Sequence, residues 1–242
     1  MEKIKYSVII ISYNEEDNII DCIKSVECGR KDVEIIIVDG GSKDLTVELI
    51  KNSGHKIIHS RLGRGIQLNM GAKEAVGDIL LFLHSDTKLP ANAFEILDEI
   101  FSKQEILAGT FQLSFDYNHP LLRLYSMFTK IDSLFTNFGD QAITIRKNLF
   151  EKINGYPDWK MFEDVQLLRN IRRISKIHRF PAAVTTSSRS FIQHGIFKQQ
   201  IKSAWLLTLF LLGFSPDRLY DKYYPEFCAK PFKPKINMGE QG

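Results

Sequence analysis

Acidic residues stand just past the ends of two apolar runs in this 242-residue chain. The run at residues 33–38 stops at Asp39, and the run at residues 79–83 is followed by His84 and then by Asp86. Nearly continuous aliphatic runs of this length are typical of strands buried on both faces of a mostly parallel sheet. Ligands of open α/β sheets bind beyond the carboxyl ends of such strands. The pattern therefore predicts an acidic site at one sheet edge, where a metal and a nucleotide could meet.

Two groups of acidic residues suit different chemistry. Asp86 offers an oxygen ligand to a divalent ion, with His84 as a nitrogen ligand beside it. Mg²⁺ and Mn²⁺ usually take one or two protein carboxylates together with substrate phosphates, although an isolated Asp could also simply cap a helix. Further along, Glu163 and Asp164 precede an amphipathic helix. A carboxylate there could be a general base toward an acceptor hydroxyl, or could only complement the helix dipole.

Side chains suited to nucleotide binding follow the first expected strand, at residues 6–11. The ring of Tyr13 can stack on a base, and Ser12 and Glu15 can hydrogen-bond a ribose or base. The alternative is that this segment only caps the next helix, through Asn14 or Asp17.

Two glycine-containing turns also have residues suited to nucleotide binding. Asp39 can accept a hydrogen bond from a base imino group, and Gly41 lets the backbone approach a ligand before the potential cap at Ser42. Residues 63–65, Gly-Arg-Gly, open a helix, whose N-terminus together with Arg64 suits a diphosphate. Each glycine could equally be a plain turn former.

The elements that must position these residues alternate over the first hundred positions. Strands are expected at residues 6–11, 33–38, 56–59 and 78–83, and helices at 16–26, 45–52, 66–76 and 91–102. This alternation predicts parallel strands joined by right-handed crossovers. The second half changes character, with a half-exposed strand at 110–115, an amphipathic aromatic segment at 121–138, a strand at 141–145 and a helix at 165–174.

Composition excludes several classes of protein. A net charge of +3 without a basic block argues against nucleic-acid binding. Three cysteines without metal-like spacing argue against a disulfide framework and favour a cytoplasmic setting. The N-terminus lacks the pattern of a signal peptide, and no apolar run reaches the ~20 residues that span a bilayer. The apolar segment at 204–214 is expected to be a buried helix or one that rests on a membrane.

The order and spacing of these motifs resemble the family 2 inverting glycosyltransferases with a GT-A fold. The resemblance covers about residues 6–215 and rests on the segments at 7–15, 38–44, 69–72, 83–86 and 163–164. Residues 138–141 (Phe-Gly-Asp-Gln) and 186–189 (Thr-Ser-Ser-Arg) are similar to a bacterial subgroup of small single-domain members.

The resemblance implies a fold and a domain plan. The fold is α/β, a Rossmann-like and mostly parallel central sheet flanked by helices, with a more variable helical C-terminal part. One domain would cover residues 1–225, with a nucleotide-sugar-binding half at 1–104 and an acceptor and catalytic-base half at 105–225. The proline-containing tail at 226–242 is expected to be loosely ordered.

The resemblance also implies roles for individual residues. Asp164 would be the catalytic base with Glu163 beside it, and Asp86 would bind Mg²⁺ or Mn²⁺ with His84 and His194 as further ligands. The donor, a nucleoside-diphosphate sugar and by preference a UDP-sugar, would meet Ser12, Tyr13, Glu15, Asp39, Gly41, Ser42, Arg64, Asn69 and Ser85. The acceptor would be an unidentified hydroxyl compound, lipid-linked if the aromatic segment faces outward, with peripheral contact at the inner face of the membrane.

Two departures from the family pattern keep alternatives open. His84 replaces the first Asp of the Asp-x-Asp motif, and Leu68 stands where an Arg often precedes the Asn-x-Gly, so Arg64 would have to substitute. One alternative is a sugar nucleotidyltransferase, against which the first loop lacks the glycine-rich, basic sequence expected of such enzymes. The other is a non-catalytic nucleotide-sugar-binding module, which only His84 supports.

Overall fold

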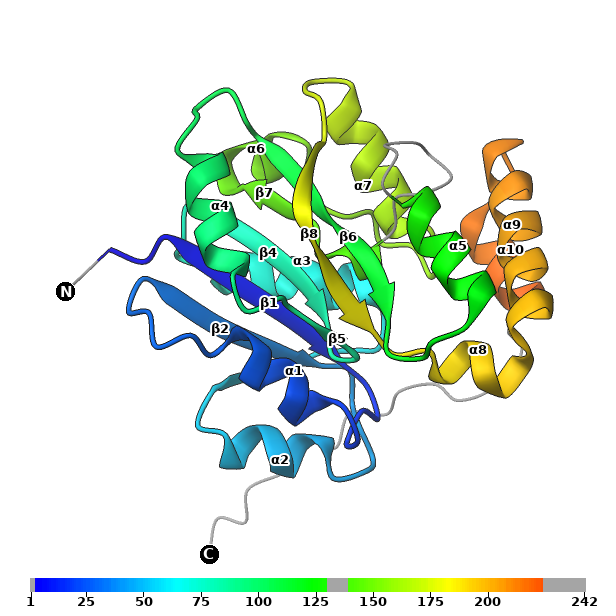
Figure 1. Ribbon diagram of the computed structural model, residues 1–242, viewed down its shortest axis with the longest axis horizontal. Helices are drawn as coiled ribbons and strands as arrows, with labels where there is room; N and C mark the ends of the chain where they lie inside the picture. Colours follow the sequence, from blue (N-terminus) through cyan, green and yellow to red (C-terminus); the bar gives the residue numbers. More distant parts are fainter. Residues whose placement is uncertain (1–2, 130–138, 224–242) are drawn as a thin grey trace, which may run out of the picture.

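The computed structural model describes residues 3–129 and 139–223, in which helices cover both faces of one eight-stranded sheet (Figure 1). The strand order is β3-β2-β1-β4-β7-β6-β8-β5. The strands are β1 (Tyr6–Ser12), β2 (Val33–Asp39), β3 (Lys56–His59), β4 (Ile79–His84), β5 (Thr87–Lys88), β6 (Ala108–Phe115), β7 (Thr144–Arg146) and β8 (His178–Thr186). The helices are α1 (Ile19–Val26), α2 (Thr46–Asn52), α3 (Arg64–Glu74), α4 (Ala93–Phe101), α5 (Pro120–Phe128), the 3₁₀ helix η1 (Gly139–Gln141), α6 (Lys147–Lys152), α7 (Glu163–Arg172), α8 (Arg189–His194), α9 (Ile196–Leu211) and α10 (Pro216–Tyr223).

The first four strands are parallel, and their carboxyl ends lie in register. Ser12 at the end of β1 is opposite Asp39 of β2, and Ile11 is opposite His84 of β4. The predicted alternation of strands and helices is therefore confirmed, and the two acidic strand ends do meet at one edge.

The second half of the sheet is mixed, and the sequence pattern missed its longest strand. β8 runs parallel to β6, with a register irregularity between Thr110 and Gln112 of β6. Pro181 lies in β8 beside this irregularity. Proline lacks an N–H for the ladder and is confined to edges and bulges, which is why the segment does not look like a central strand. The strand expected at 141–145 is shorter, because η1 occupies its start.

Two apolar layers hold the helices to the sheet. α1, α2 and α4 pack on one face, and α3, α6 and α7 on the other. α3 comes very close to the sheet, because a Cβ at Gly71 would lie 2.3 Å from Cγ2 of Ile9. Of the segment expected at 121–138, α5 accounts for the first part, and residues 130–138 and the tail at 226–242 lie outside the described residues. No helix within the described ranges is long and apolar enough to cross a membrane.

Charged side chains close the opposite, amino-terminal edge of β1. The carboxylate of Asp98 on α4 accepts hydrogen bonds from Lys5, from Arg30 and from the hydroxyl of Tyr6. Burial raises the pKa of the Asp98 carboxyl, but these hydrogen bonds outweigh burial and hold the pKa at about 2.

Asp98→Asn should therefore destabilise the fold near neutral pH but not at pH 2. A carboxyl with a depressed folded-state pKa stabilises the fold above its unfolded pKa of about 3.9, and this contribution is lost as the pH falls through the folded value. Because the side chain is 34% exposed and partly screened, we expect a loss of about 1 kcal/mol at pH 6. Urea unfolding of both proteins across this pH range measures the difference. A difference in unfolding free energy between the two proteins that stays constant down to pH 2 would contradict the electrostatic explanation.

Candidate active site

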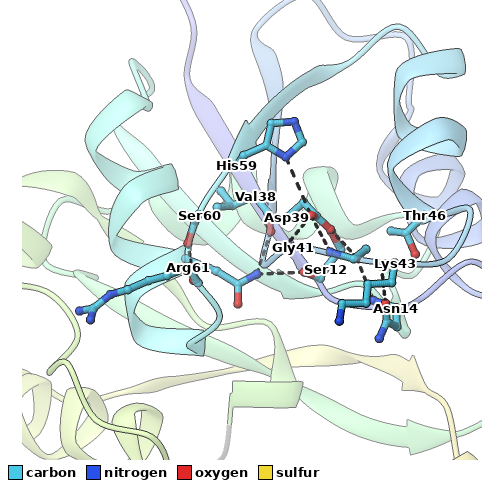
Figure 2. Close-up of polar contacts among 12 residues, drawn as sticks. Ser12, Asn14, Val38, Asp39, Gly41, Lys43, Thr46, His59, Ser60 and Arg61 are labelled. Carbon is cyan, nitrogen blue, oxygen red and sulfur yellow. Dashed lines mark hydrogen bonds and ion pairs between the residues drawn. The ribbon is translucent and has the colours of Figure 1, made fainter. Parts of the chain in front are cut away.

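The ends of β1 and β2 form a hydrogen-bonded turn around Asp39 (Figure 2). The Asp39 side chain is buried, and its Oδ2 accepts hydrogen bonds from the backbone N–H groups of Gly41 (2.8 Å) and Ser42 (3.0 Å). Its Oδ1 accepts from the hydroxyls of Ser42 and Ser12. A nucleobase bound at this turn would hydrogen-bond to Asp39 only by replacing one of these hydrogen bonds.

Gln67 ties the turn to α3, although nothing in the sequence pattern singled out this residue as part of the site. Its buried amide Nε2 donates to the backbone oxygens of Ser12 (3.0 Å) and Val38 (2.9 Å). The only sequence signal was a polar residue on the sheet-facing side of a helix. One side chain thereby holds the carboxyl ends of β1 and β2 together.

Glu15 connects the first loop to the C-terminal part of the chain. Its backbone N–H donates to Oγ1 of Thr46 (2.8 Å), and its carboxylate accepts from the guanidinium of Arg189 (2.8 Å). Burial raises the pKa of Glu15, and Asp86 adds to this effect, whereas the hydrogen bonds from Asn18 and Arg189 lower it. The first loop and the end of β4 therefore share one electrostatic environment.

Carboxylates from three segments act electrostatically on Arg64, an exposed residue at the start of α3. We call Asp86, Asp140, Glu163 and Asp164 the acidic cluster. Desolvation lowers the pKa of Arg64, but the acidic cluster raises it above its ordinary value. The structure thus brings together four residues predicted from the sequence and adds Asp140. The sequence signal for Asp140 was the Gly-Asp-Gln phrase, to which no role was assigned.

The helix η1 joins the predicted base to the end of β4. The backbone N–H of Gly139 donates to Oδ2 of Asp164 (2.5 Å), and that of Val165 donates to Oδ1 (2.7 Å). A Cβ at Gly139 would lie 3.3 Å from Oδ2 of Asp164 and 3.3 Å from Nε2 of His84. Asp164 and His84 therefore flank the same glycine, and the Asp164 carboxylate has a fixed orientation.

The segment before α7 is held against α3. Oδ1 of Asn69 accepts from the N–H of Tyr156 (3.0 Å), and its Nδ2 donates to the Tyr156 oxygen (2.9 Å). A Cβ at Gly65 would lie 2.5 Å from the oxygen of Pro157. Phe162, just before α7, has a left-handed φ of 60°, a strained conformation for a bulky residue. Asn69, predicted among the donor contacts, uses both ends of its amide to position this segment.

Burial dominates the electrostatics of the acidic cluster. It raises the pKa of Glu163 to about 7, with Asp164 adding to the effect and Arg64 opposing it. It likewise raises the pKa of Asp140 to about 7. Among the residues that the structure describes, Oε2 of Glu163 and Oδ1 of Asp140 are buried without a hydrogen-bond partner. Burial and Arg64 lower the pKa of His84 to about 4, so its imidazole is neutral at physiological pH.

The predicted metal ligands are Asp86, His84 and His194. Within residues 3–129 and 139–223, no group of three or more His, Cys, Asp or Glu side chains is placed to hold a metal ion. His194 ends α8, and its side chain lies outside the described part of the structure. Mg²⁺ and Mn²⁺ commonly take one or two carboxylates and complete their shell with substrate phosphates and water. These residues therefore fit a cation shared with a diphosphate, and do not fit one caged by protein alone.

Two further predicted donor residues lie at the same edge. Tyr13 is half-buried just after β1. Ser85 is buried, and its backbone N–H donates to the oxygen of Ile11 (3.2 Å), which ties the end of β4 to β1. All predicted donor residues therefore lie at the carboxyl edge or on α3.

A model of glycosyl transferase family 2 matches residues 7–164, more than half of the chain, and the chain belongs to this family. The 4,4'-diaponeurosporenoate glycosyltransferase of Staphylococcus haemolyticus is 26% identical over 157 residues, covering 61% of this chain and 41% of that protein. The chain thus spans less than half the length of this relative.

Solved structures agree on the fold. TarS 1–349 of S. aureus, in complex with UDP-GlcNAc, has a TM-score of 0.60 and 20% identity, covering 76% of this chain and 58% of that one. The mannosyltransferase PcManGT of Pyrobaculum calidifontis, in complex with GDP-Man and Mn²⁺, has a TM-score of 0.66 and 14% identity, covering 91% and 68%. The predicted GT-A fold is confirmed.

Proposed function

We propose that this chain is a metal-dependent, inverting glycosyltransferase that uses a nucleoside-diphosphate sugar. The observation that carries the proposal is the placement of Asp164, whose carboxylate is oriented by two backbone N–H groups beside Arg64 and the end of β4. The catalytic base for the acceptor, the metal site for the diphosphate and the turn that binds the nucleotide would then lie at the same edge of the sheet. The complexes of TarS with UDP-GlcNAc and of PcManGT with GDP-Man support a nucleotide-sugar donor.

The reaction would be a single displacement at the anomeric carbon. Asp164 takes the proton of the acceptor hydroxyl while that oxygen forms a bond to the anomeric carbon. The bond from this carbon to the diphosphate breaks on the opposite face, and the electron pair leaves with the nucleoside diphosphate. Attack opposite the leaving group inverts the configuration.

The chain's own residues would stabilise the leaving diphosphate. Arg64 supplies a positive charge at the start of α3, where the helix N-terminus also favours an anion. Asp86, with the neutral imidazole of His84, would hold Mg²⁺ or Mn²⁺, which supplies Lewis-acid neutralisation of the diphosphate charge when bound. The complex of PcManGT with GDP-Man and Mn²⁺ supports the use of a divalent metal.

We infer an acceptor with an apolar portion, such as a lipid-linked hydroxyl compound. A cavity of about 500 Å³ lies between β6 and α5. Its lining combines the apolar side chains of Phe115, Leu122 and Met127 with polar ones such as Asn118 and Arg123. The related S. haemolyticus protein is named 4,4'-diaponeurosporenoate glycosyltransferase.

The proposal is tested by thermal stabilisation with UDP, GDP, dTDP and CDP, each with and without Mn²⁺. A nucleotide at ~100 times its Kd stabilises the folded chain by about 2.7 kcal/mol. We expect one nucleotide to raise the Tm in a Mn²⁺-dependent way, and Asp86→Asn to remove the Mn²⁺ dependence. Glu151→Gln, an exposed acid-to-amide change on α6, is the matched control. The absence of a shift with all four nucleotides would overturn the proposed donor site.

A further inference from the structure

Exposed apolar side chains are concentrated in two segments of the described structure. The large apolar side chains that remain exposed there are Tyr117, Leu121, Leu124, Met127, Phe128, Ile192, Phe197, Ile201, Trp205, Leu212 and Phe214. In the rest of the described chain only Leu45, Leu62, Val76 and Ile174 are comparably exposed, and these are scattered. Scattered exposed residues are ordinary on a protein surface, whereas a concentration marks an interaction site.

On α9 the exposed residues form a continuous stripe. Phe197 (68% exposed), Ile201 (55%) and Trp205 (53%) are each four residues apart and so lie on one side of the helix. The opposite side of α9 is also apolar, and there Leu206 and Phe210 are buried in a cluster with residues of α7 and α10. Packing on the protein buries only one side of this helix. Because the other side is also apolar, it needs a second apolar environment.

α5 extends the same surface. It packs against α9, and the two helices lie on the same side of the molecule (Figure 1). Its side chains Leu124 (49%), Met127 (61%) and Phe128 (52%) are exposed. We call the exposed apolar side chains of α5, α8 and α9, with Leu212 and Phe214, the apolar face.

The charged side chains carried by α5 and α9 themselves are all basic. Residues 195–214 contain Lys198 and Lys202 but no Asp or Glu, and residues 120–128 contain Arg123 and likewise no acidic residue. Acidic residues lie at the border, where α10 carries Asp217 and Asp221 and where Glu15 and Asp17 pair with Arg189 of α8. Lys198 and Arg123 are exposed. Apolar and aromatic side chains flanked by lysine and arginine are the combination that binds an anionic bilayer surface. A symmetric contact between two copies would instead bring these like charges together.

We propose that the apolar face binds the surface of a membrane that contains anionic lipids. Phe197, Ile201 and Leu212 would enter the boundary between headgroups and acyl chains, and Trp205 would lie at the headgroup level. This inference is independent of the proposed glycosyl transfer. It places α5, which borders the 500 Å³ cavity, at the lipid surface.

Co-sedimentation of the full chain with vesicles tests the proposal. We expect binding to mixed phosphatidylglycerol and phosphatidylcholine vesicles, and weaker binding to pure phosphatidylcholine. Phe197→Glu and Ile201→Glu should each lower the partition coefficient about tenfold or more, since each removes a large apolar side chain from the boundary. Ile174→Glu, an exposed apolar position outside the apolar face, should bind as the unsubstituted chain does. Unchanged melting temperatures would show that the variants are folded.

Three results would overturn the proposal. The first is no sedimentation with the mixed vesicles at low salt. The second is full binding by both Glu variants. The third is a concentration-dependent dimer, abolished by the same variants, without vesicle binding, since that would make the apolar face an interface between copies. Nucleotide-induced stabilisation, measured in parallel, shows separately whether the donor site is intact.

Discussion

Asp164→Asn should lower the rate of glycosyl transfer by about 10²–10⁴-fold, the range that a positioned general base contributes. The amide has nearly the shape of the carboxylate, and its oxygen can still accept from the N–H of Gly139. It cannot take the acceptor proton, so the chemical step is lost while the fold and the nucleotide turn survive. The measurement is initial transfer rate against the nucleotide-induced change in Tm for the same preparation.

The neighbouring acid provides the comparison that identifies the base. Glu163→Gln removes a buried carboxyl whose pKa is raised to about 7 by burial and by Asp164. If Asp164 is the base, the Glu163 variant retains more activity than the Asp164 variant, and the Glu151→Gln control is fully active. A fully active Asp164→Asn enzyme would transfer the role of base to Glu163.

Phe82→Ala should destabilise the chain by about 3–5 kcal/mol, the usual cost of removing a buried phenylalanine ring. Phe82 lies in β4, 1% exposed, with its ring centroid 5.1 Å from that of Phe150 and 5.1 Å from that of Tyr156. Tyr156 lies in the segment that precedes α7 and that Asn69 holds against α3. The space left by the Phe82 ring would therefore lie between β4, which precedes Asp86, and the segment that leads to Asp164.

Chemical denaturation and nucleotide binding would measure the two consequences of the Phe82 cavity. For a chain of this size each 1 kcal/mol lowers the Tm by about 2–4 °C. Phe197→Ala, at a position 68% exposed, should stay within about 0.5 kcal/mol. A Phe82→Ala variant as stable as the parent would mean that Phe150 and Tyr156 collapse into the space. The packing assigned to this aromatic group would then be wrong.

The first four strands were predictable because apolar periodicity is a local property. Strands at residues 33–38 and 56–59 were recognised within a residue of their observed limits, since each aliphatic run ends at a polar residue. Because parallel strands end at the same edge of a sheet, Asp39 and His84 are then expected at one edge without further information. β8 was missed because Pro181 interrupts its pattern, and its long-range pairing with β6 and β5 makes it a strand.

The candidate active site was likewise predictable in part from the sequence and in part only from the tertiary structure. The sequence by itself determined which acidic residues end strands or begin α7, because these positions follow from local pattern and from the family resemblance. Only the tertiary structure decided which of them act electrostatically on Arg64, that Asp140 joins them, and that Asn69 and Gln67 hold backbone segments together. Burial, unpartnered oxygens and shifted pKa values are properties of the packed molecule. They depend on segments far apart in the chain excluding water from one another, which no local pattern encodes.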